Sequence, residues 1–100
     1  MSHTIVPSKR LLKAIKRYRK GGRRQILSAA EEAIRLLSVH DDRSLFILGT
    51  RWRDHALKGE KSGIRELHLS FDDLLLYRID TAGSAIELLD IVSHEELEKM

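Results

Sequence analysis

Apolar residues recur every three or four positions over the first forty residues, a spacing typical of helices that bury one face. The pattern predicts two helices, over residues 9–20 and 23–38. Gly21 and Gly22 separate them, so we expect the helices to fold back on each other as an antiparallel hairpin. Before the first helix, a short apolar run at residues 3–7 predicts a strand.

From residue 64 the period of the apolar residues falls to two, as in a strand with one buried face. The residues expected to face the core are Leu67, Leu69 and Phe71, and those expected on the other face are Glu66, His68 and Ser70. Residues 74–79 are apolar on both faces, which is typical of a central strand, and residues 85–92 predict a further strand. Residues 41–63 show no long period and are expected to be mostly loop. Ser93 is a candidate cap for a terminal helical turn.

Together these elements predict an α+β fold in a single domain over residues 1–100. The N-terminal strand and the helical hairpin are expected to pack on an antiparallel sheet of about four strands. With the helices on one face, the other face would stay at least partly open to a ligand.

Charge is unevenly distributed along the chain. Residues 1–30 contain nine lysines or arginines and no acid, whereas residues 86–100 contain five acids and one lysine. A cationic face on the first helix is suited to binding a polyanion. The alternative is a solvated helix surface, and charge alone does not decide between the two.

Several classes of protein are excluded by what the sequence lacks. It has no cysteine, which excludes disulfides, thiol catalysis and cysteine-based zinc sites. It has no run of about 18 apolar residues, so no membrane span is expected. The N-terminus lacks the apolar region of a signal peptide, so a cytoplasmic location is expected. Phosphate-loop, dinucleotide-binding and serine-hydrolase motifs are absent.

Three histidines and one aspartate in the second half of the chain could carry proton transfer, because imidazole titrates close to neutral pH. They are His55 in the segment RDHALKG, His68 on the first long strand, Asp72 four residues later, and His94 near the end. Each histidine also has a structural interpretation, as a hydrogen-bonded sheet residue, a surface-loop residue or a helix cap. A metal site from the same four residues is an alternative, but no HxH or HExxH spacing supports it.

Three segments resemble one known family. DHALKG at residues 54–59, GIRELHLSFDDLLLYRI at residues 63–79 and SHEEL at residues 93–97 are similar to motifs of the YafQ branch of the RelE-like toxins. Those proteins are mRNA interferases of type II toxin–antitoxin systems. The resemblance implies a RelE-like microbial RNase fold. It also implies a ribosome-dependent endoribonuclease, in which the ribose 2′-hydroxyl attacks the adjacent phosphate of mRNA.

The resemblance implies roles for individual residues. His55, His68, Asp72 and His94 fall on family positions held by histidine or aspartate, and would serve proton transfer. Cationic residues nearby would contact phosphate and stabilise the charged phosphorane; the candidates are Arg51, Arg53, Lys58 and Arg65. This chemistry requires no metal and no cofactor.

The resemblance also implies partners. A cognate antitoxin would hold the toxin inactive in a toxin–antitoxin hetero-oligomer. The substrate would be mRNA on the 70S ribosome, and the basic helices would hold ribosomal RNA through salt-dependent phosphate contacts.

The sequence departs from the family pattern at three positions. Asp73 and Glu98 stand where the family has aromatic residues, and Asp90 lies near the position of a missing arginine. Less stacking and more negative charge would weaken cleavage of RNA. The alternative function is therefore a non-catalytic module on the same fold that binds nucleic acid or a protein partner.

Overall fold

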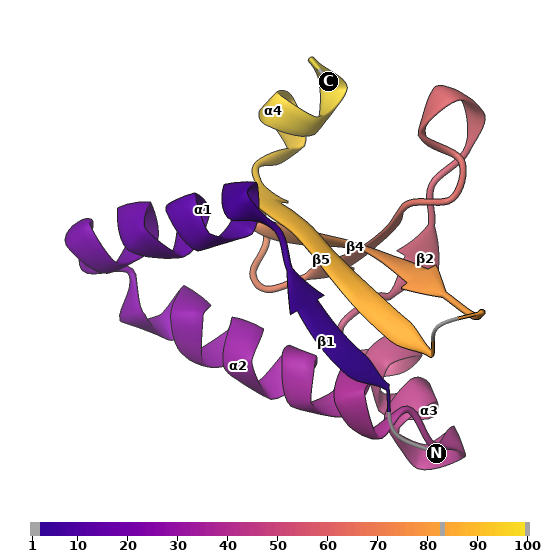
Figure 1. Ribbon diagram of the computed structural model, residues 1–100. Coiled ribbons are helices and arrows are strands. Elements are labelled where there is room, and N and C mark those ends of the chain that lie inside the picture. The colour runs from indigo at the N-terminus through magenta and orange to yellow at the C-terminus, as the bar shows by residue number, and fades with distance from the viewer. Residues whose placement is uncertain (1–2, 83, 100) are drawn as a thin grey trace.

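The structure, a computed structural model, describes residues 3–82 and 84–99 (Figure 1). Its elements follow one another in an α+β order that begins with a strand and ends with a short helix. They are β1 (Thr4–Pro7), α1 (Lys9–Lys20), α2 (Arg24–Val39), α3 (Asp42–Arg51), β2 (His55–Ala56), the 3-10 helix η1 (Gly59–Lys61), β3 (Arg65–His68), β4 (Leu74–Asp80), β5 (Ala85–Val92) and α4 (His94–Glu98).

The strands form one sheet in the order β1-β5-β4-β3-β2. β2 to β5 pair antiparallel, as expected, but β1 pairs parallel with β5 and adds a fifth strand at the edge. Parallel pairing requires a long connection between the two strands, and here everything from α1 to β4 provides it. The expected α+β fold is confirmed, and the sheet is mixed and five-stranded rather than antiparallel and four-stranded.

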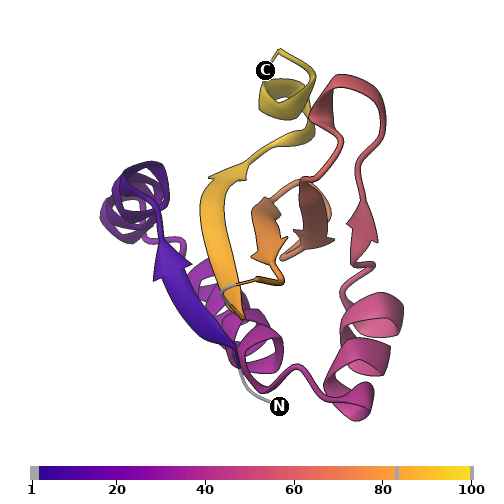
Figure 2. The same ribbon diagram turned by 45° about the vertical axis from the view of Figure 1, so that its right-hand side comes forward.

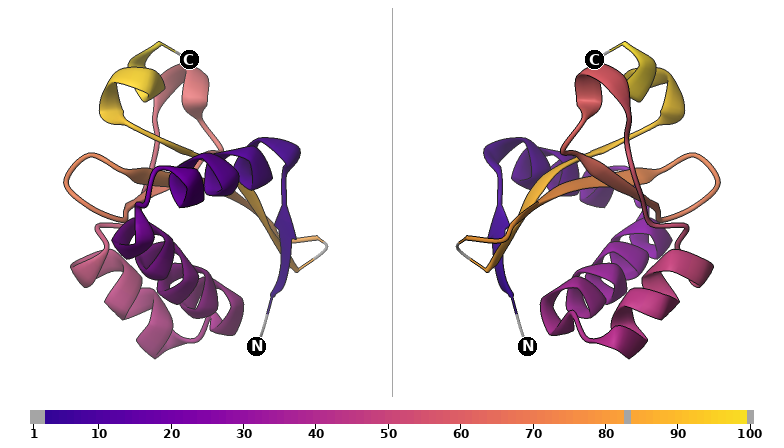
Figure 3. Two further views of the ribbon diagram at one scale, coloured as in Figure 1. Left: turned by 90° about the vertical axis from the view of Figure 1, so that its left-hand side faces the viewer. Right: turned by 90° about the vertical axis from the view of Figure 1, so that its right-hand side faces the viewer.

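The helices α1, α2 and α3 pack on one face of the sheet and enclose the main core (Figures 2 and 3). The turn at Gly21 and Gly22 joins α1 to α2, as the sequence predicts. Both helices point their apolar stripes at the sheet, where side chains of β3, β4 and β5 meet them. This core contains Leu11, Ala14, Tyr18, Ile26, Ala30, Ala33, Leu37, Leu48, Leu67, Leu75, Tyr77, Ile86, Leu88 and Ile91.

The opposite face of the sheet carries a second, smaller apolar cluster. Leu74, Leu76 and Val92 form its buried part, and Leu57, Ile64, Leu89 and Leu97 pack against them. The segment around η1 and the helix α4 therefore cover part of the face that was expected to be open. His68 and Glu66 pair with Leu74 and Leu76 across β3 and β4, so the polar residues of β3 lie on this face beside the cluster.

The helix α3 is the largest departure from the expected elements, because residues 42–51 were expected to be loop. Asp41 begins the helix by accepting a hydrogen bond from the backbone of Ser44 at 2.7 Å. Leu48 is fully buried against α2, and Trp52 follows it into the core. The sequence did not indicate this helix, because the four apolar residues at 45–48 are consecutive and so do not show a helical period.

Phe71 is the second departure. The expected strand stops at His68, and the segment from Leu69 to Asp73 forms a turn instead. The backbone amides of Leu69 and Ser70 both donate to the carbonyl oxygen of Asp73, at 2.8 and 3.3 Å. The alternation of faces ends with the strand, and Phe71 is 94% exposed rather than buried.

The terminal helix is confirmed with its cap. The Ser93 side chain accepts from the backbone amide of Glu96, and the Glu96 side chain accepts from the backbone amide of Ser93, which is a capping box. Among the described residues, none of the helices combines the length and apolar character that crossing a membrane requires.

The packing of α3 can be tested by two leucine truncations on the same helix. Leu48 is 0% exposed and Leu45 is 40% exposed. We expect Leu48→Ala to lower the free energy of unfolding by about 2–5 kcal/mol, because it leaves a cavity. Leu45→Ala is expected to change it by less than about 1 kcal/mol. Denaturant unfolding measures both values, and equal effects would contradict a packed α3.

Candidate active site

The fold brings the four predicted proton-transfer residues to one region. The ring of His68, at the end of β3, lies 6.0 Å from the ring of His55 on β2 and 5.7 Å from the ring of His94 at the start of α4, between ring centroids. Asp72, in the turn after β3, contacts His94. His68 therefore stands between two other imidazoles, although the three come from distant parts of the chain.

The pairing of β2 with β3 places His55 opposite Glu66. The Nε2 atom of His55 lies 2.8 Å from the Oε1 atom of Glu66, and its Nδ1 atom lies 2.7 Å from the carbonyl oxygen of Arg53. Both ring nitrogens of His55 thus lie within hydrogen-bonding distance of an oxygen, which fixes the orientation of the ring. Arg53 presents its carbonyl group from a left-handed backbone conformation, with φ of 53°.

Glu66 is a site residue that sequence reasoning did not select. It is only 6% exposed, and its second oxygen, Oε2, has no hydrogen-bond partner among the described residues. Buried carboxylates of this kind are uncommon without a functional or ionic reason. The alternation along β3 was the available signal, since it put Glu66 on the same face as His68, two residues away.

His68 is half-buried, and burial is the main reason that its pKa is lowered. The Glu66 carboxylate opposes this shift, whereas His94, His55 and Arg53 add to it. Its Nδ1 atom is buried and without a partner among the described residues. The neutral imidazole is thus favoured at neutral pH, which is the state that accepts a proton.

Asp72 holds His94 rather than His68. One oxygen of Asp72, Oδ1, accepts from the backbone amide of His94 at 3.0 Å and from its ring Nδ1 at 2.8 Å. The backbone hydrogen bond and then the ring hydrogen bond lower the pKa of Asp72. The contact fixes the orientation of the His94 ring and leaves Nε2 for a ligand.

A buried network anchors the turn that carries Asp72. The neighbouring Asp73 accepts hydrogen bonds from the hydroxyls of Tyr18 and Ser70, both at 2.6 Å, and from the guanidinium of Arg23 at 2.8 Å. Burial alone would raise the pKa of Asp73, but these hydrogen bonds and the charge of Arg23 lower it. The carboxylate of Asp73 therefore stays ionised, but Arg23 balances its charge inside the protein, and it does not present the repulsive charge that its sequence position suggested.

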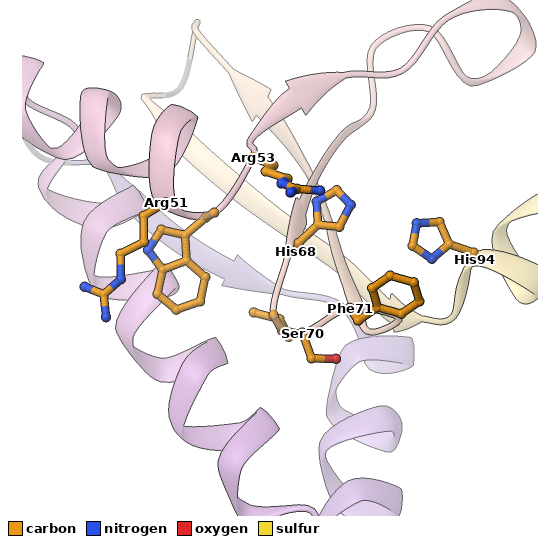
Figure 4. Close-up of a pocket in the computed structure, with 8 residues that line it drawn as sticks. Arg51, Arg53, His68, Ser70, Phe71 and His94 are labelled. Carbon is orange, nitrogen blue, oxygen red and sulfur yellow. The ribbon is translucent and has the colours of Figure 1, made fainter.

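A pocket of about 520 Å³ opens beside this group (Figure 4). It contains two of the three histidines, two cationic residues and one exposed aromatic ring. Its lining residues are Arg51, Trp52, Arg53, His68, Leu69, Ser70, Phe71 and His94. The arrangement suits an anionic ligand with an apolar part, because guanidinium groups and an aromatic ring share one opening.

The four predicted phosphate-contacting residues are divided by the fold. Arg51 and Arg53 line the pocket, and the Arg51 guanidinium also pairs with the exposed Glu32 at 3.5 Å. Arg65 does not, since its guanidinium pairs with Asp54 at 3.3 Å and bonds the hydroxyl of Tyr77. Lys58 is exposed before η1 and also lies outside the pocket lining. The residues that depart from the family pattern are Asp73, Asp90 and Glu98, and none of them lines the pocket.

Three of these side chains could also hold a metal ion. The ligand atoms of His55, Glu66 and His68 all lie within 4.8 Å of one another. Two imidazoles and a carboxylate are a donor set that zinc and copper accept. This set differs from the alternative drawn from the sequence, because it includes Glu66 and leaves out His94 and Asp72.

Comparisons with known proteins agree over nearly the whole chain. A family model described as the bacterial toxin of type II toxin–antitoxin systems, YafQ, matches residues 3–99. A metal-bound toxin from Helicobacter pylori is 32% identical with a TM-score of 0.78, and the match covers 97% of this chain and 99% of that one. Among curated proteins, none matches the chain.

Two further solved structures share the fold. YafQ from E. coli strain BL21(DE3) is 20% identical with a TM-score of 0.77, over 95% of this chain and 97% of that one. The E. coli DinJ–YafQ toxin–antitoxin complex matches with 22% identity and a TM-score of 0.75, over 97% of this chain and 98% of that one. At this identity the two structures show the fold alone.

The electrostatics of His68 can be tested by nuclear magnetic resonance. The ring of His68 is expected to titrate below the ordinary histidine range, and Glu66→Gln should lower its pKa further because a nearby negative charge is removed. Glu87→Gln, an exposed change on β5, is the control. The His68 pKa is lower in the folded chain than in the unfolded chain, so the unfolded chain binds more protons as the pH drops below about 6.5. The free energy of unfolding of the wild-type chain should therefore fall over that range. A His68 pKa at or above that value would contradict the geometry.

Proposed function

The chain belongs to the YafQ family of bacterial toxins of type II toxin–antitoxin systems, and we propose that it acts as an endoribonuclease that cleaves mRNA on the ribosome. The observation that carries this proposal is the position of His68 between His55 and His94, beside a pocket lined by two arginines. Three imidazoles at such distances supply both a proton acceptor and a proton donor for one phosphodiester.

The reaction that fits these groups is transfer of a phosphodiester to its own ribose. Neutral His68 takes the proton from a ribose 2′-hydroxyl, and the 2′-oxygen forms a bond to the adjacent phosphorus. The bond from phosphorus to the 5′-oxygen breaks, and His94 gives that oxygen a proton through Nε2. The products are a 2′,3′-cyclic phosphate and a 5′-hydroxyl. His68 takes the basic role because its pKa is lowered, and Asp72 orients His94.

The remaining groups would stabilise charge. Arg51 and Arg53 line the pocket and supply cations for the phosphorane, whose equatorial oxygens carry the developing negative charge. The contact between His55 and Glu66, at 2.8 Å, would hold the His55 ring in place beside His68. As proposed, the reaction uses no metal. An ion bound by His55, Glu66 and His68 would occupy the base and oppose cleavage.

The partners follow from the same family. One of the E. coli YafQ structures that share this fold is a complex with the antitoxin DinJ, and we propose that a cognate antitoxin likewise holds this chain in a hetero-oligomer. The exposed cations of α1 would hold ribosomal RNA; they are Lys9, Arg10, Lys13, Lys16, Arg17, Arg19 and Lys20. These partners and the target place the proposed action in the cytoplasm.

The alternative, a non-catalytic binding module, loses part of its support. It depended on the negative charges of Asp73, Asp90 and Glu98 near the nucleic acid. Asp73 is paired inside the protein, and the other two lie outside the pocket lining. The alternative still makes a distinct prediction, because a binding module would not depend on His68.

Induced expression in a bacterium tests the proposal. The wild-type chain is expected to arrest growth and to produce new mRNA ends at codon-phased positions, detected by primer extension. His68→Ala and Asp72→Ala should each abolish both effects without unfolding the chain, because they remove the base and release the His94 ring. Asp42→Ala, an exposed carboxylate outside the pocket lining, is the matched control and should remain toxic.

Two results would count against this assignment. Toxicity that survives His68→Ala in a folded protein would remove His68 from the mechanism. Normal growth and intact mRNA with a folded wild-type chain would favour the binding module. Circular dichroism of each purified variant provides the check on folding.

A further inference from the structure

Phe71 occupies an unusual position for a large apolar side chain. It is 94% exposed at the edge of the pocket that contains His68 and His94 (Figure 4). The remaining aromatic residue of the pocket, Trp52, is buried in the core. Apart from the two imidazoles, Phe71 is thus the aromatic side chain that the pocket offers to a ligand.

The exposure of Phe71 does not come from a loosely held loop. The turn around it is closed by the backbone amides of Leu69 and Ser70, which donate to the Asp73 carbonyl oxygen. The Ser70 hydroxyl donates to the Asp73 carboxylate at 2.6 Å and accepts from the Asp73 backbone amide at 3.2 Å. The hydroxyl of Tyr18, on α1, also donates a hydrogen bond to the Asp73 carboxylate and so holds the turn against that helix. The backbone that carries the ring is fixed before a ligand arrives, which reduces the entropy lost on binding.

The neighbouring charges narrow the class of ligand. The side chain of Arg53 and two imidazoles line the same pocket, and Arg51 also lines it, with its guanidinium paired to Glu32 at 3.5 Å. An apolar peptide would leave these polar groups desolvated without partners, which is costly. A nucleotide matches both kinds of group, because its phosphate pairs with the cations while its planar base stacks on an aromatic ring.

We propose that Phe71 forms a base-binding subsite, in which its ring stacks on the base of a nucleotide next to the phosphate that is cut. This inference rests on the proposed function, since it takes RNA to be the ligand of the pocket. The Phe71 ring contacts the flat face of the base and forms no hydrogen bonds with the edge of the base. It therefore contributes affinity and position to the RNA rather than strict base identity.

The test is a binding cycle with short single-stranded RNA. A His68→Ala background prevents cleavage, and dissociation constants come from fluorescence anisotropy. We expect Phe71→Ala and Phe71→Leu each to weaken binding about 10- to 100-fold, as for the loss of one base–aromatic stack. Phe71→Tyr should stay within about threefold of the background protein, because tyrosine keeps the aromatic face.

Abasic substitutions identify the stacked nucleotide. A series of RNAs is made in which each member lacks the base at a different position. With phenylalanine at residue 71, one member of the series should bind less tightly than the intact RNA. The Phe71→Ala protein should bind this abasic RNA as tightly as it binds the intact RNA, because the ring that would stack on the missing base is already absent. Equal affinities for Phe71, Phe71→Ala and Phe71→Leu, or losses that simply add in this cycle, would overturn the subsite.

Cleavage separates this inference from the function on which it rests. If the chain with Phe71→Ala cleaves mRNA as fast as wild type while His68→Ala does not, the nuclease stands and the subsite is wrong. If the wild-type chain cleaves nothing but the abasic cycle shows coupling, the subsite stands and the nuclease is wrong. An absence of RNA binding by the background protein overturns the subsite.

Discussion

The register of β3 between its two neighbours is the constraint on which the site depends. Leu67 lies in the main core, so Glu66 and His68, on either side of it, must face away from the helices. The same register sets His55 opposite Glu66 on β2. A slip of one residue would reverse every side chain of the strand and carry His68 into the core. The burial of one leucine thus positions one carboxylate and two imidazoles.

A second constraint fixes the groups that do not lie on β3. The buried Asp73 ties the turn after the strand to Tyr18 and Arg23, at the end of α1 and the start of α2. The turn presents Asp72, which in turn orients His94. The helical hairpin supplies none of the pocket-lining residues. It contributes to the pocket by holding the turn that carries Asp72 in place.

Much of the fold could be predicted because its long elements have clear periods. The two helices of the hairpin, the central strand and the last strand each show one pattern over many residues. The helix α3 lacked such a pattern, since its apolar residues are consecutive and its burial depends on contact with α2. The parallel pairing of β1 with β5 joins the two ends of the chain, and no local signal reports it.

The candidate site was predictable in its residue types but not in its contacts. The histidines and Asp72 could be selected from chemistry and from resemblance. Glu66 was passed over because a glutamate on a polar strand face is ordinary until its burial is known. Arg65 was selected for its charge, yet its pairing with Asp54 and Tyr77 depends on side chains eleven and twelve residues away in the sequence. Tertiary contacts decide which charged groups reach a ligand.

Cleavage by purified protein tests the central claim most directly. A defined mRNA would be incubated with the chain, free in solution and on translating ribosomes, and the ends of any products would be identified. The account predicts cleavage only on ribosomes, with 5′-hydroxyl and 2′,3′-cyclic phosphate ends, and none with His68→Ala. Intact mRNA on ribosomes with a folded wild-type chain, or the same products with His68→Ala, would contradict it.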